Sequence, residues 1–277
     1  MNRTLLFSLF LFCCYYSSSA CSILLYVDPT TGKVYAVNNE DYWLDEKAYL
    51  KIIPAGNQQL ARLWYGWDNF AQGGINAAGL FFDGAATPTQ PLAKGYHLPK
   101  NNLGDAILAN CKNVDEALDY LEKEKIALTT GHMLFGDGNG NGVVVEWING
   151  EKRITTRKDN YLMMTNYLIN DTTAGNYPCQ RHIAMLKQIE HIEQNSELVD
   201  LKTIGGVLAH AVQIPVKNSK GRKSGTLYSS FFDITDMRMT LVYQLDNSRK
   251  ITLDLKQEFE KPTSQTIRFA DIAPNRL

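Results

Sequence analysis

Residues 20–43 read ACSILLYVDPTTGKVYAVNNEDYW and predict a β-hairpin near the start of the chain. Two strand-like runs, Ser22–Val27 and Val34–Val37, flank residues 28–33, where Pro, Thr and Gly supply a turn. The first run directly follows Cys21, and the second leads into Asn38-Asn-Glu-Asp41. The hairpin therefore runs from a cysteine to a group of amide and carboxyl side chains.

The residues before Cys21 have the features of a removable secretion signal. Arg3 gives a short basic start, and residues 5–14 form an apolar run that is too short to span a bilayer. The small residues that a signal peptidase accepts follow at Ser18, Ser19 and Ala20. We therefore expect residues 1–20 to be a signal peptide, residues 21–277 to form a single domain, and the mature protein to be exported, either periplasmic or secreted.

Cleavage after Ala20 would make Cys21 the first residue of the mature chain. A terminal cysteine carries a thiol nucleophile and an amine base on one residue. The reference pKa of an α-amine is about 7.7–8.0, so part of it is neutral at mildly basic pH. Breaking an amide also needs donors for the developing oxyanion, and carboxylates, Asn amides and Arg suit the supporting roles.

The rest of the chain alternates groups of strands and helices. Helical patterning is expected over residues 103–125, with Asn113 as N-cap, and over 180–194 and 201–212. Strand-like runs are expected in the segments 73–84, 132–135, 143–148, 161–169, 226–234, 239–245 and 251–255. This order favours an α+β fold with antiparallel sheets over an alternating parallel βαβ sheet.

The composition is that of a globular protein without a strong charge bias. The 277 residues carry a formal net charge of −1, so no broad basic field points to nucleic acid. No apolar segment after Ala20 is long enough to cross a membrane, and a membrane partner is expected only if Cys21 is lipidated. A homo-oligomer remains open.

Cysteines and histidines give no metal site. Cys21, Cys111 and Cys179 remain after the predicted cleavage, and the last two are either a disulfide pair or two buried thiols. The histidines show no ligand spacing. Residues 137–142, DGNGNG, resemble half of a calcium loop, but Ile148 stands where its twelfth-position Glu is required, so a hairpin turn is favoured.

Several segments, taken in order, resemble the choloylglycine hydrolase family. These linear amide C–N hydrolases include bile-salt hydrolases, penicillin V acylases and a related acyltransferase and acid-amidase group. The segments that carry the resemblance are Cys21-Ser-Ile, residues 37–43 (VNNEDYW), 74–80 (GINAAGL), 137–146, 164–166 (MTN), Arg181 and 226–233 (TLYSSFFD). No single segment is specific, but their order covers essentially the whole mature chain. The resemblance implies the four-layer αββα sandwich of N-terminal nucleophile hydrolases.

The resemblance also implies roles for matching residues. Cys21 would be the nucleophile and its α-amine the base, and Asp41 would hydrogen-bond the amine or the thiol. Asn166 would take part in the oxyanion hole or position the substrate, and Arg181 would balance charge near the thiolate and help to hold Asp41. The substrate would be a small-molecule N-acyl amide, and no cofactor would be needed.

Two positions depart from the family pattern. Asn38 stands where many members have an Arg, and an amide supplies no positive charge to a thiolate. Ala86 stands near the position of an oxyanion Asn, so a backbone N–H or Asn76 would have to donate instead. We therefore expect Asn38 and Asn76 near the substrate, and a divergent member rather than a close bile-salt hydrolase.

Other interpretations stay open from the sequence. The same acyl-enzyme could pass its acyl group to another amine, as an acyltransferase does. Alternatively, Cys21 could be lipidated, which would leave a surface or binding protein without catalysis. Glu40 is expected to face solvent, and the cluster Trp64, Tyr65, Trp67 and Phe70 is expected to serve either the core or an acyl pocket.

Overall fold

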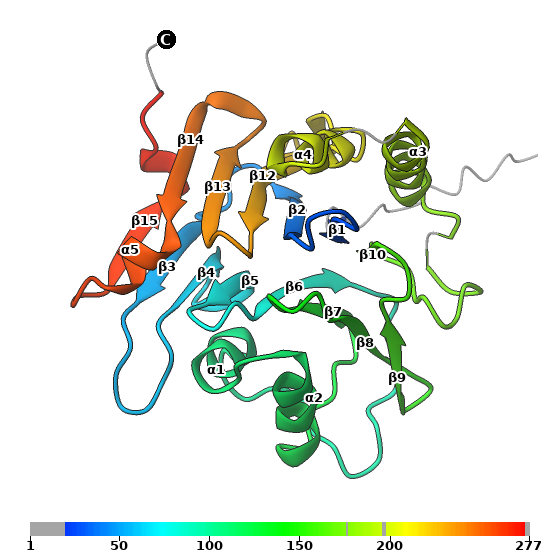
Figure 1. Ribbon diagram of the computed structural model, residues 1–277. Coiled ribbons are helices and arrows are strands. Elements are labelled where there is room, and N and C mark those ends of the chain that lie inside the picture. The colour runs from blue at the N-terminus through cyan, green and yellow to red at the C-terminus, as the bar shows by residue number, and fades with distance from the viewer. Residues whose placement is uncertain (1–19, 176, 196–197, 275–277) are drawn as a thin grey trace, which may run out of the picture.

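The computed structural model describes residues 20–175, 177–195 and 198–274. Of the predicted signal peptide only Ala20 falls within this part, and residues 1–19 lie outside it. Two antiparallel sheets lie face to face, with α3 (Gln180–Asn195) and α4 (Leu201–Ala209) over one sheet and α1 (Leu103–Asn110) and α2 (Val114–Lys123) over the other (Figure 1). The predicted α+β, four-layer αββα arrangement is therefore confirmed.

The first sheet has β1, the first described strand, in its interior. Its order is β10-β1-β2-β12-β13-β14, with β11 paired to β12. The bounds of these strands are β1 (Ser22–Val27), β2 (Val34–Trp43), β10 (Tyr161–Met164), β11 (Val216–Lys217), β12 (Lys223–Asp233), β13 (Arg238–Tyr243) and β14 (Asp246–Asp254). The predicted hairpin is β1 and β2, whose register sets Ser22 opposite Asn39.

The second sheet follows the chain almost in sequence order, as β15-β3-β4-β5-β6-β7-β8-β9. Its strands are β3 (Tyr49–Ile53), β4 (Arg62–Trp67), β5 (Phe70–Asn76), β6 (Phe81–Ala86), β7 (Gly131–Gly136), β8 (Gly142–Ile148), β9 (Glu151–Thr156) and β15 (Gln265–Arg268). Residues 137–141 connect β7 to β8, and the Asp137 carboxylate accepts the backbone N–H groups of Asn139 and Asn141. This segment is the predicted hairpin turn.

The helices begin at capping residues that the sequence offers. Asn113 accepts the Glu116 N–H and caps α2 as predicted, and Asp200 caps α4 in the same way. The helical patterning expected over 103–125 corresponds to two helices, because the chain is extended at Cys111 and a new helix starts after Asn113. A short helix, α5 (Leu255–Phe259), and a 3₁₀ turn, Phe269–Asp271, complete the described elements.

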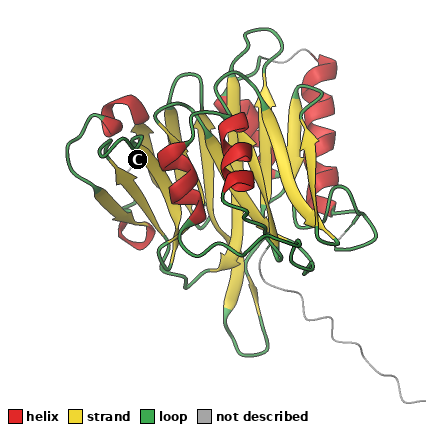
Figure 2. Cartoon of the chain, turned by 90° about the horizontal axis from the view of Figure 1, so that it is seen from below, coloured by secondary structure: helices red, strands yellow, loops and turns green. Residues whose placement is uncertain are grey.

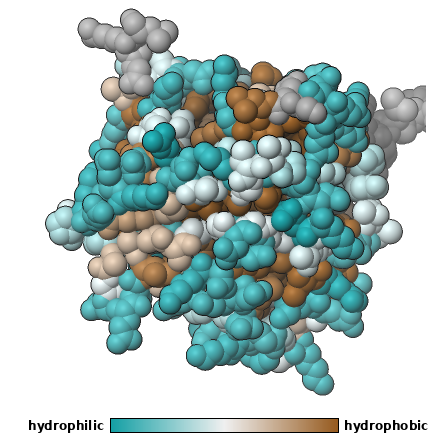
Figure 3. Space-filling model, viewed as in Figure 1, coloured by the Kyte–Doolittle hydropathy of each residue, from teal (hydrophilic) through white to brown (hydrophobic). Residues whose placement is uncertain are grey.

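Three apolar layers separate the four layers of secondary structure. The largest lies between the sheets and includes Ile23, Leu25 and Phe232, while the others lie beneath each helical pair. Figure 2 shows helices crossing the face of the strands, and the face in Figure 3 is largely hydrophilic with apolar side chains visible between polar ones. Because side chains alternate along a strand, each buried strand must supply apolar residues to both faces.

The layer between the sheets also contains polar residues close to Cys21. Asn38 and Glu40 share the inward face of β2 with Val34 and Ala36, and both are almost fully buried. β12 contains a register shift between Thr226 and Tyr228, so that Thr226 pairs with Asp41 and Tyr228 with Glu40. This bulge gives each of the two adjacent carboxyls its own hydroxyl partner.

Candidate active site

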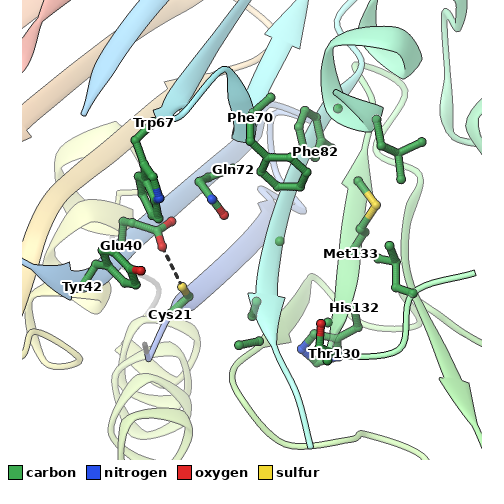
Figure 4. Close-up of a pocket in the computed structure, with 18 residues that line it drawn as sticks. Cys21, Glu40, Tyr42, Trp67, Phe70, Gln72, Phe82, Thr130, His132 and Met133 are labelled. Atoms are coloured by element: carbon green, nitrogen blue, oxygen red, sulfur yellow. Dashed lines mark hydrogen bonds between the residues drawn. The ribbon is translucent and has the colours of Figure 1, made fainter. Parts of the chain in front are cut away.

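Cys21 lines a pocket and lies immediately before β1. Its side chain is 2% exposed, and its thiol donates a hydrogen bond to Oε1 of Glu40 over 3.1 Å. Figure 4 shows the two side chains pointing toward one another from neighbouring strands. Burial, and then the carboxyls of Glu40 and Asp41, raise the pKa of the Cys21 thiol well above its usual range.

Glu40 is not a solvent-facing residue, and the sequence-based expectation was wrong. The reason is that β2 is an interior strand covered on both faces, so even its polar positions are buried. The second Glu40 oxygen accepts a long hydrogen bond of 3.4 Å from the Tyr228 hydroxyl. Burial raises the pKa of Glu40 to about 7.

Asp41 projects from the opposite face of β2 and does not contact the thiol. Its Oδ1 accepts the Thr226 hydroxyl at 2.6 Å, and its Oδ2 lies 3.6 Å from Nη1 of Arg181. That Oδ2 has no hydrogen-bond partner among the described residues. Burial raises the pKa of Asp41 to about 8, although Thr226 and Arg181 both favour its charged form.

Arg181 and Asn166 come together beside Cys21. Arg181, in the first turn of α3, donates to the Cys21 carbonyl oxygen and, at 2.7 Å, to the Ser22 hydroxyl. Its other terminal nitrogen donates to Oδ1 of Asn166 at 3.0 Å, and Nδ2 of Asn166 donates to the Ala86 carbonyl oxygen at 2.9 Å. The structure thus gathers Cys21, Asp41, Asn166 and Arg181 at one place.

Asn38 and Asn76, the two predicted substrate-binding residues, have different surroundings from each other. Asn38 is fully buried in the layer between the sheets, where its amide lies near Glu40 and Asp83 without a well-aligned hydrogen bond. Asn76 is not brought to the pocket. Its amide donates to the Leu108 and Cys111 carbonyls and accepts the Ala78 and Leu80 N–H groups, so it fixes the turn between β5 and β6.

The Asp83 carboxyl is also buried and lies close to Glu40. Asp83, on β6, accepts the Tyr65 hydroxyl at 2.6 Å, and the same hydroxyl accepts from Ser230 at 3.0 Å. Burial, and then Glu40, raise the pKa of Asp83 well above its usual range. Within the described chain, no Lys or Arg forms an ion pair with Glu40 or Asp83.

The pocket itself has a volume of about 360 Å³ and joins Cys21 and Glu40 to an aromatic wall. Tyr42 and Trp67 stack with their ring centroids 4.6 Å apart, and Phe70 is 44% exposed. Phe82 and Met133 complete the wall (Figure 4). Leu103 also lines the pocket. Of the predicted aromatic cluster, Trp67 and Phe70 line the pocket, while Trp64 and Tyr65 are buried in the core layers.

His132 lines the pocket and was missed by sequence reasoning, which sought only metal-ligand spacing. Its ring contacts two acceptors, the Thr165 carbonyl oxygen at 2.7 Å and the Glu146 carboxylate at 3.3 Å. Glu146 also accepts the backbone N–H groups of Ile169 and Asn170. Burial alone would raise the pKa of Glu146, but these hydrogen bonds together lower it. The His132–Glu146 pair therefore fixes residues 165–170, which include Asn166.

Three smaller findings concern cysteines, metals and membrane-spanning helices. Cys21, Cys111 and Cys179 are all buried free thiols, so the alternative of a disulfide between the last two is not realised. In the described part of the chain, no three His, Cys, Asp or Glu side chains are grouped to hold a metal ion. Within the same residues, no helix has both the length and the apolar character needed to cross a membrane.

Comparison with known structures gives the same fold. A variant of the conjugated bile acid hydrolase from Clostridium perfringens is 16% identical, with a TM-score of 0.72 over 89% of this chain and 96% of the other. Penicillin V acylase from Agrobacterium tumefaciens is 18% identical, with a TM-score of 0.70 over 92% of each chain. At these identities the likeness is one of fold.

Comparison by sequence gives the family. No curated protein matches the chain. A family model, that of acyl-coenzyme A:6-aminopenicillanic acid acyl-transferase, matches residues 30–249, which is most of the chain. Together with the shared sandwich, this match confirms the kinship that the order of motifs predicted. The chain belongs to the acyl-coenzyme A:6-aminopenicillanic acid acyl-transferase family.

Proposed function

We propose that the protein is an exported cysteine N-terminal nucleophile hydrolase that cleaves a non-peptide linear amide. The observation that carries this proposal is that Cys21 lines a pocket and directly follows the predicted signal-peptidase site. Removal of residues 1–20 would free the α-amine at the same place. The supporting residues gathered there are Asp41, Asn166 and Arg181.

The proposed reaction proceeds through an acyl-enzyme. The Cys21 sulfur attacks the acyl carbonyl, a base on the enzyme accepts the thiol proton, and the amine leaves with a proton. Water then releases the acid. The α-amine is the base that the family resemblance implies. Asn166 is suited to donate a hydrogen bond to the substrate carbonyl oxygen. Its Nδ2 has two N–H groups, of which one donates to the Ala86 carbonyl oxygen and the second is left for the substrate.

The pocket favours an apolar acyl group. Stacked Tyr42 and Trp67, with Phe70, Phe82 and Met133, offer an aromatic and thioether surface, and such surfaces bind apolar groups well. The solved structures with the same fold are described as a conjugated bile acid hydrolase and a penicillin V acylase. We therefore propose a small-molecule N-acyl amide with an aromatic or aliphatic acyl chain.

A second candidate function is acyl transfer. The family that the chain belongs to is named for an acyl-transferase, which favours an acceptor amine in place of water. The lipid-anchor interpretation gains less support. The Cys21 sulfur is buried and hydrogen-bonded to Glu40, whereas a lipidated sulfur needs access to the surface.

The test compares two cysteine variants of the exported protein. Mass analysis should show a mature chain that begins at an unmodified Cys21. Incubation with a panel of N-acyl amides should release amine and acid, and Cys21→Ala should abolish the release. Cys111→Ala is the matched control, because Cys111 is equally buried but lies in the layer of α1 and α2. A lipid on Cys21, or full activity of Cys21→Ala, would falsify the proposal. Added acceptor amine separates transfer from hydrolysis by the product formed.

A further inference from the structure

His132 is a buried histidine whose two ring nitrogens both face acceptors. It lies on β7 and lines the pocket that Cys21 also lines (Figure 4), and its side chain is not exposed to solvent. Its Nε2 lies 2.7 Å from the Thr165 carbonyl oxygen, and its Nδ1 lies 3.3 Å from Oε2 of Glu146. The reaction steps proposed above make no use of this side chain.

The contacts of Glu146 determine the charge of the ring. Its two oxygens accept three N–H groups, from the backbone of Ile169 and from the backbone and side chain of Asn170. Burial opposes the charged form of Glu146, but hydrogen bonds from His132 and Asn170 outweigh it and lower its pKa, so Glu146 is ionised at neutral pH. A carboxylate and a carbonyl oxygen can only accept, so both ring contacts require an N–H. The geometry therefore makes His132 an imidazolium.

This buried ion pair holds the chain on both sides of Asn166. His132 binds the carbonyl oxygen of Thr165, the residue before Asn166. Glu146 binds the backbone N–H groups of residues 169 and 170, which follow it. Because both ends of this short segment are attached to one pair, a change at either partner should move the backbone of Asn166.

The Asn166 side chain has two further fixed contacts. Its Oδ1 accepts from Arg181 at 3.0 Å, and its Nδ2 donates to the Ala86 carbonyl oxygen at 2.9 Å. The pairing of β6 with β7 sets His132 opposite Ala85, the residue before Ala86. Because the Ala86 side chain carries no donor, the direction of the second Asn166 N–H is the more important for stabilising an oxyanion.

We propose, on the basis of the hydrolase function above, that His132 is a positioning residue for Asn166. As an imidazolium paired with Glu146, it holds the Thr165 carbonyl and thereby directs the Asn166 N–H that would meet the substrate oxygen. A neutral imidazole has one N–H and could make only one of the two contacts. The hydrogen bond from Asn166 strengthens as the substrate oxygen becomes negative, so the contribution of His132 should appear in kcat more than in KM.

Two substitutions divide the ring contacts between them. His132→Gln places an amide N–H near the position of Nε2 and can donate to Thr165, whereas His132→Asn places one near Nδ1 and can donate only to Glu146. We expect His132→Asn to lower kcat by about 10- to 100-fold with KM within about threefold, since a misplaced group costs rate at that level. His132→Gln should retain more of kcat. A His132→Asn enzyme with the kcat of the wild type overturns the proposal.

The matched control is His210→Asn, the same change at an exposed histidine that follows α4. It should leave kcat and KM unchanged. Thermal unfolding of each variant checks that the fold is kept, because breaking a buried ion pair is destabilising. If His132→Asn does not fold, Glu146→Gln takes its place in the experiments, with the same expected loss of kcat.

A double-mutant cycle tests whether His132 acts through Asn166. Asn166→Ala removes the proposed oxyanion donor and should lower kcat by about 100- to 1,000-fold. In that background His132→Asn should cost no more than about twofold, because the residue that it positions is gone and the two effects are coupled. An equal loss from His132→Asn in both backgrounds would overturn the proposal and leave His132 a purely structural residue.

Nuclear magnetic resonance of ¹⁵N-labelled mature protein gives a readout that needs no substrate. At neutral pH both ring nitrogens of His132 should carry a proton, with their signals assigned by their loss in His132→Gln. The side-chain amide signals of Asn166 should shift in His132→Asn and stay in place in His210→Asn. A His132 ring with one unprotonated nitrogen, or Asn166 signals that do not move, contradicts the proposal.

These outcomes separate the inference from the proposed function. Activity that survives Cys21→Ala would refute the hydrolase function, while the resonance experiment would still report whether His132 fixes Asn166. An inactive Cys21→Ala together with an additive cycle would keep the hydrolase and exclude His132 as a positioning residue.

Discussion

At the scale of single residues, Arg181 contacts more groups of the site than a charge-balancing role requires. Its guanidinium contacts the Cys21 carbonyl oxygen, the Ser22 hydroxyl and the Asn166 amide, and it lies 3.6 Å from Asp41. A planar guanidinium can serve several acceptors at fixed angles, whereas the compact ammonium of Lys cannot. Arg181 is therefore placed to fix the nucleophile relative to the group that would face the substrate oxygen.

Arg181→Lys should lower kcat/KM by roughly 10- to 100-fold, because a misplaced reacting group costs rate at about that level. The loss should appear mainly in kcat. Steady-state kinetics measure both effects. Lys187→Met is the control, because Lys187 lies exposed on the same helix. Equal effects of the two substitutions would show that Arg181 acts only through the stability of α3.

At the scale of elements, the sequence pattern predicted most of the strands, while the order of the layers was implied by the family resemblance. The β1–β2 hairpin and the Asn113 cap follow from short-range patterns, which local turn and capping chemistry determines. Glu40 was misplaced because its burial depends on β12 and the second sheet, which lie far along the chain. Asn76 was wrongly assigned to the substrate and His132 was missed for the same reason, since their partners at residues 108, 111, 146 and 165 are distant in sequence.

Gly73 on β5 leaves space for the contact between Tyr65 and Asp83. It lies between Tyr65 on β4 and Asp83 on β6, and a Cβ atom there would stand 2.3 Å from Oδ2 of Asp83 and 2.6 Å from the Tyr65 hydroxyl. Gly73→Ala should therefore separate the Tyr65–Asp83 pair and destabilise the fold by about 1–3 kcal/mol, the usual cost of overpacking a core. Chemical denaturation measures the change.

The matched control for this prediction is Gly206→Ala in α4. A Cβ at Gly206 meets nothing within 4 Å, so the substitution should stabilise the protein by about 0.5–1 kcal/mol through helix propensity. Destabilisation by Gly206→Ala, or no effect of Gly73→Ala, would contradict the account of close packing around Asp83.

At the scale of the whole molecule, the site is built into the layer between the two sheets. This layer excludes water from Glu40, Asp83 and Tyr65, and burial raises the pKa of each of these groups. Removal from water is unfavourable to a charged form, so the folded protein holds protons that the unfolded chain releases. The fold thus places proton-exchanging groups at the pocket at the expense of stability at higher pH.

The pH dependence of stability follows from that difference. Glu40 and Asp41 titrate at about 7 and 8 in the folded protein and near their ordinary values when unfolded. Between about pH 4 and pH 8 the unfolded state therefore binds fewer protons, and the free energy of unfolding falls as the pH rises. One pKa unit corresponds to about 1.4 kcal/mol, so we expect a loss on the order of a few kcal/mol between pH 5 and pH 8.

Thermal unfolding of the full-length chain, with the Ala20–Cys21 bond intact, measures this slope. The double variant Glu40→Gln/Asp41→Asn cannot ionise at these two positions, so its melting temperature should change less across the same range. The mature chain should lie between the two, because its new ammonium group favours the ionised carboxyls. A full-length protein that becomes more stable from pH 5 to pH 8 would show that the buried carboxyls are already ionised. A double variant with an equal slope would show that another group holds the protons.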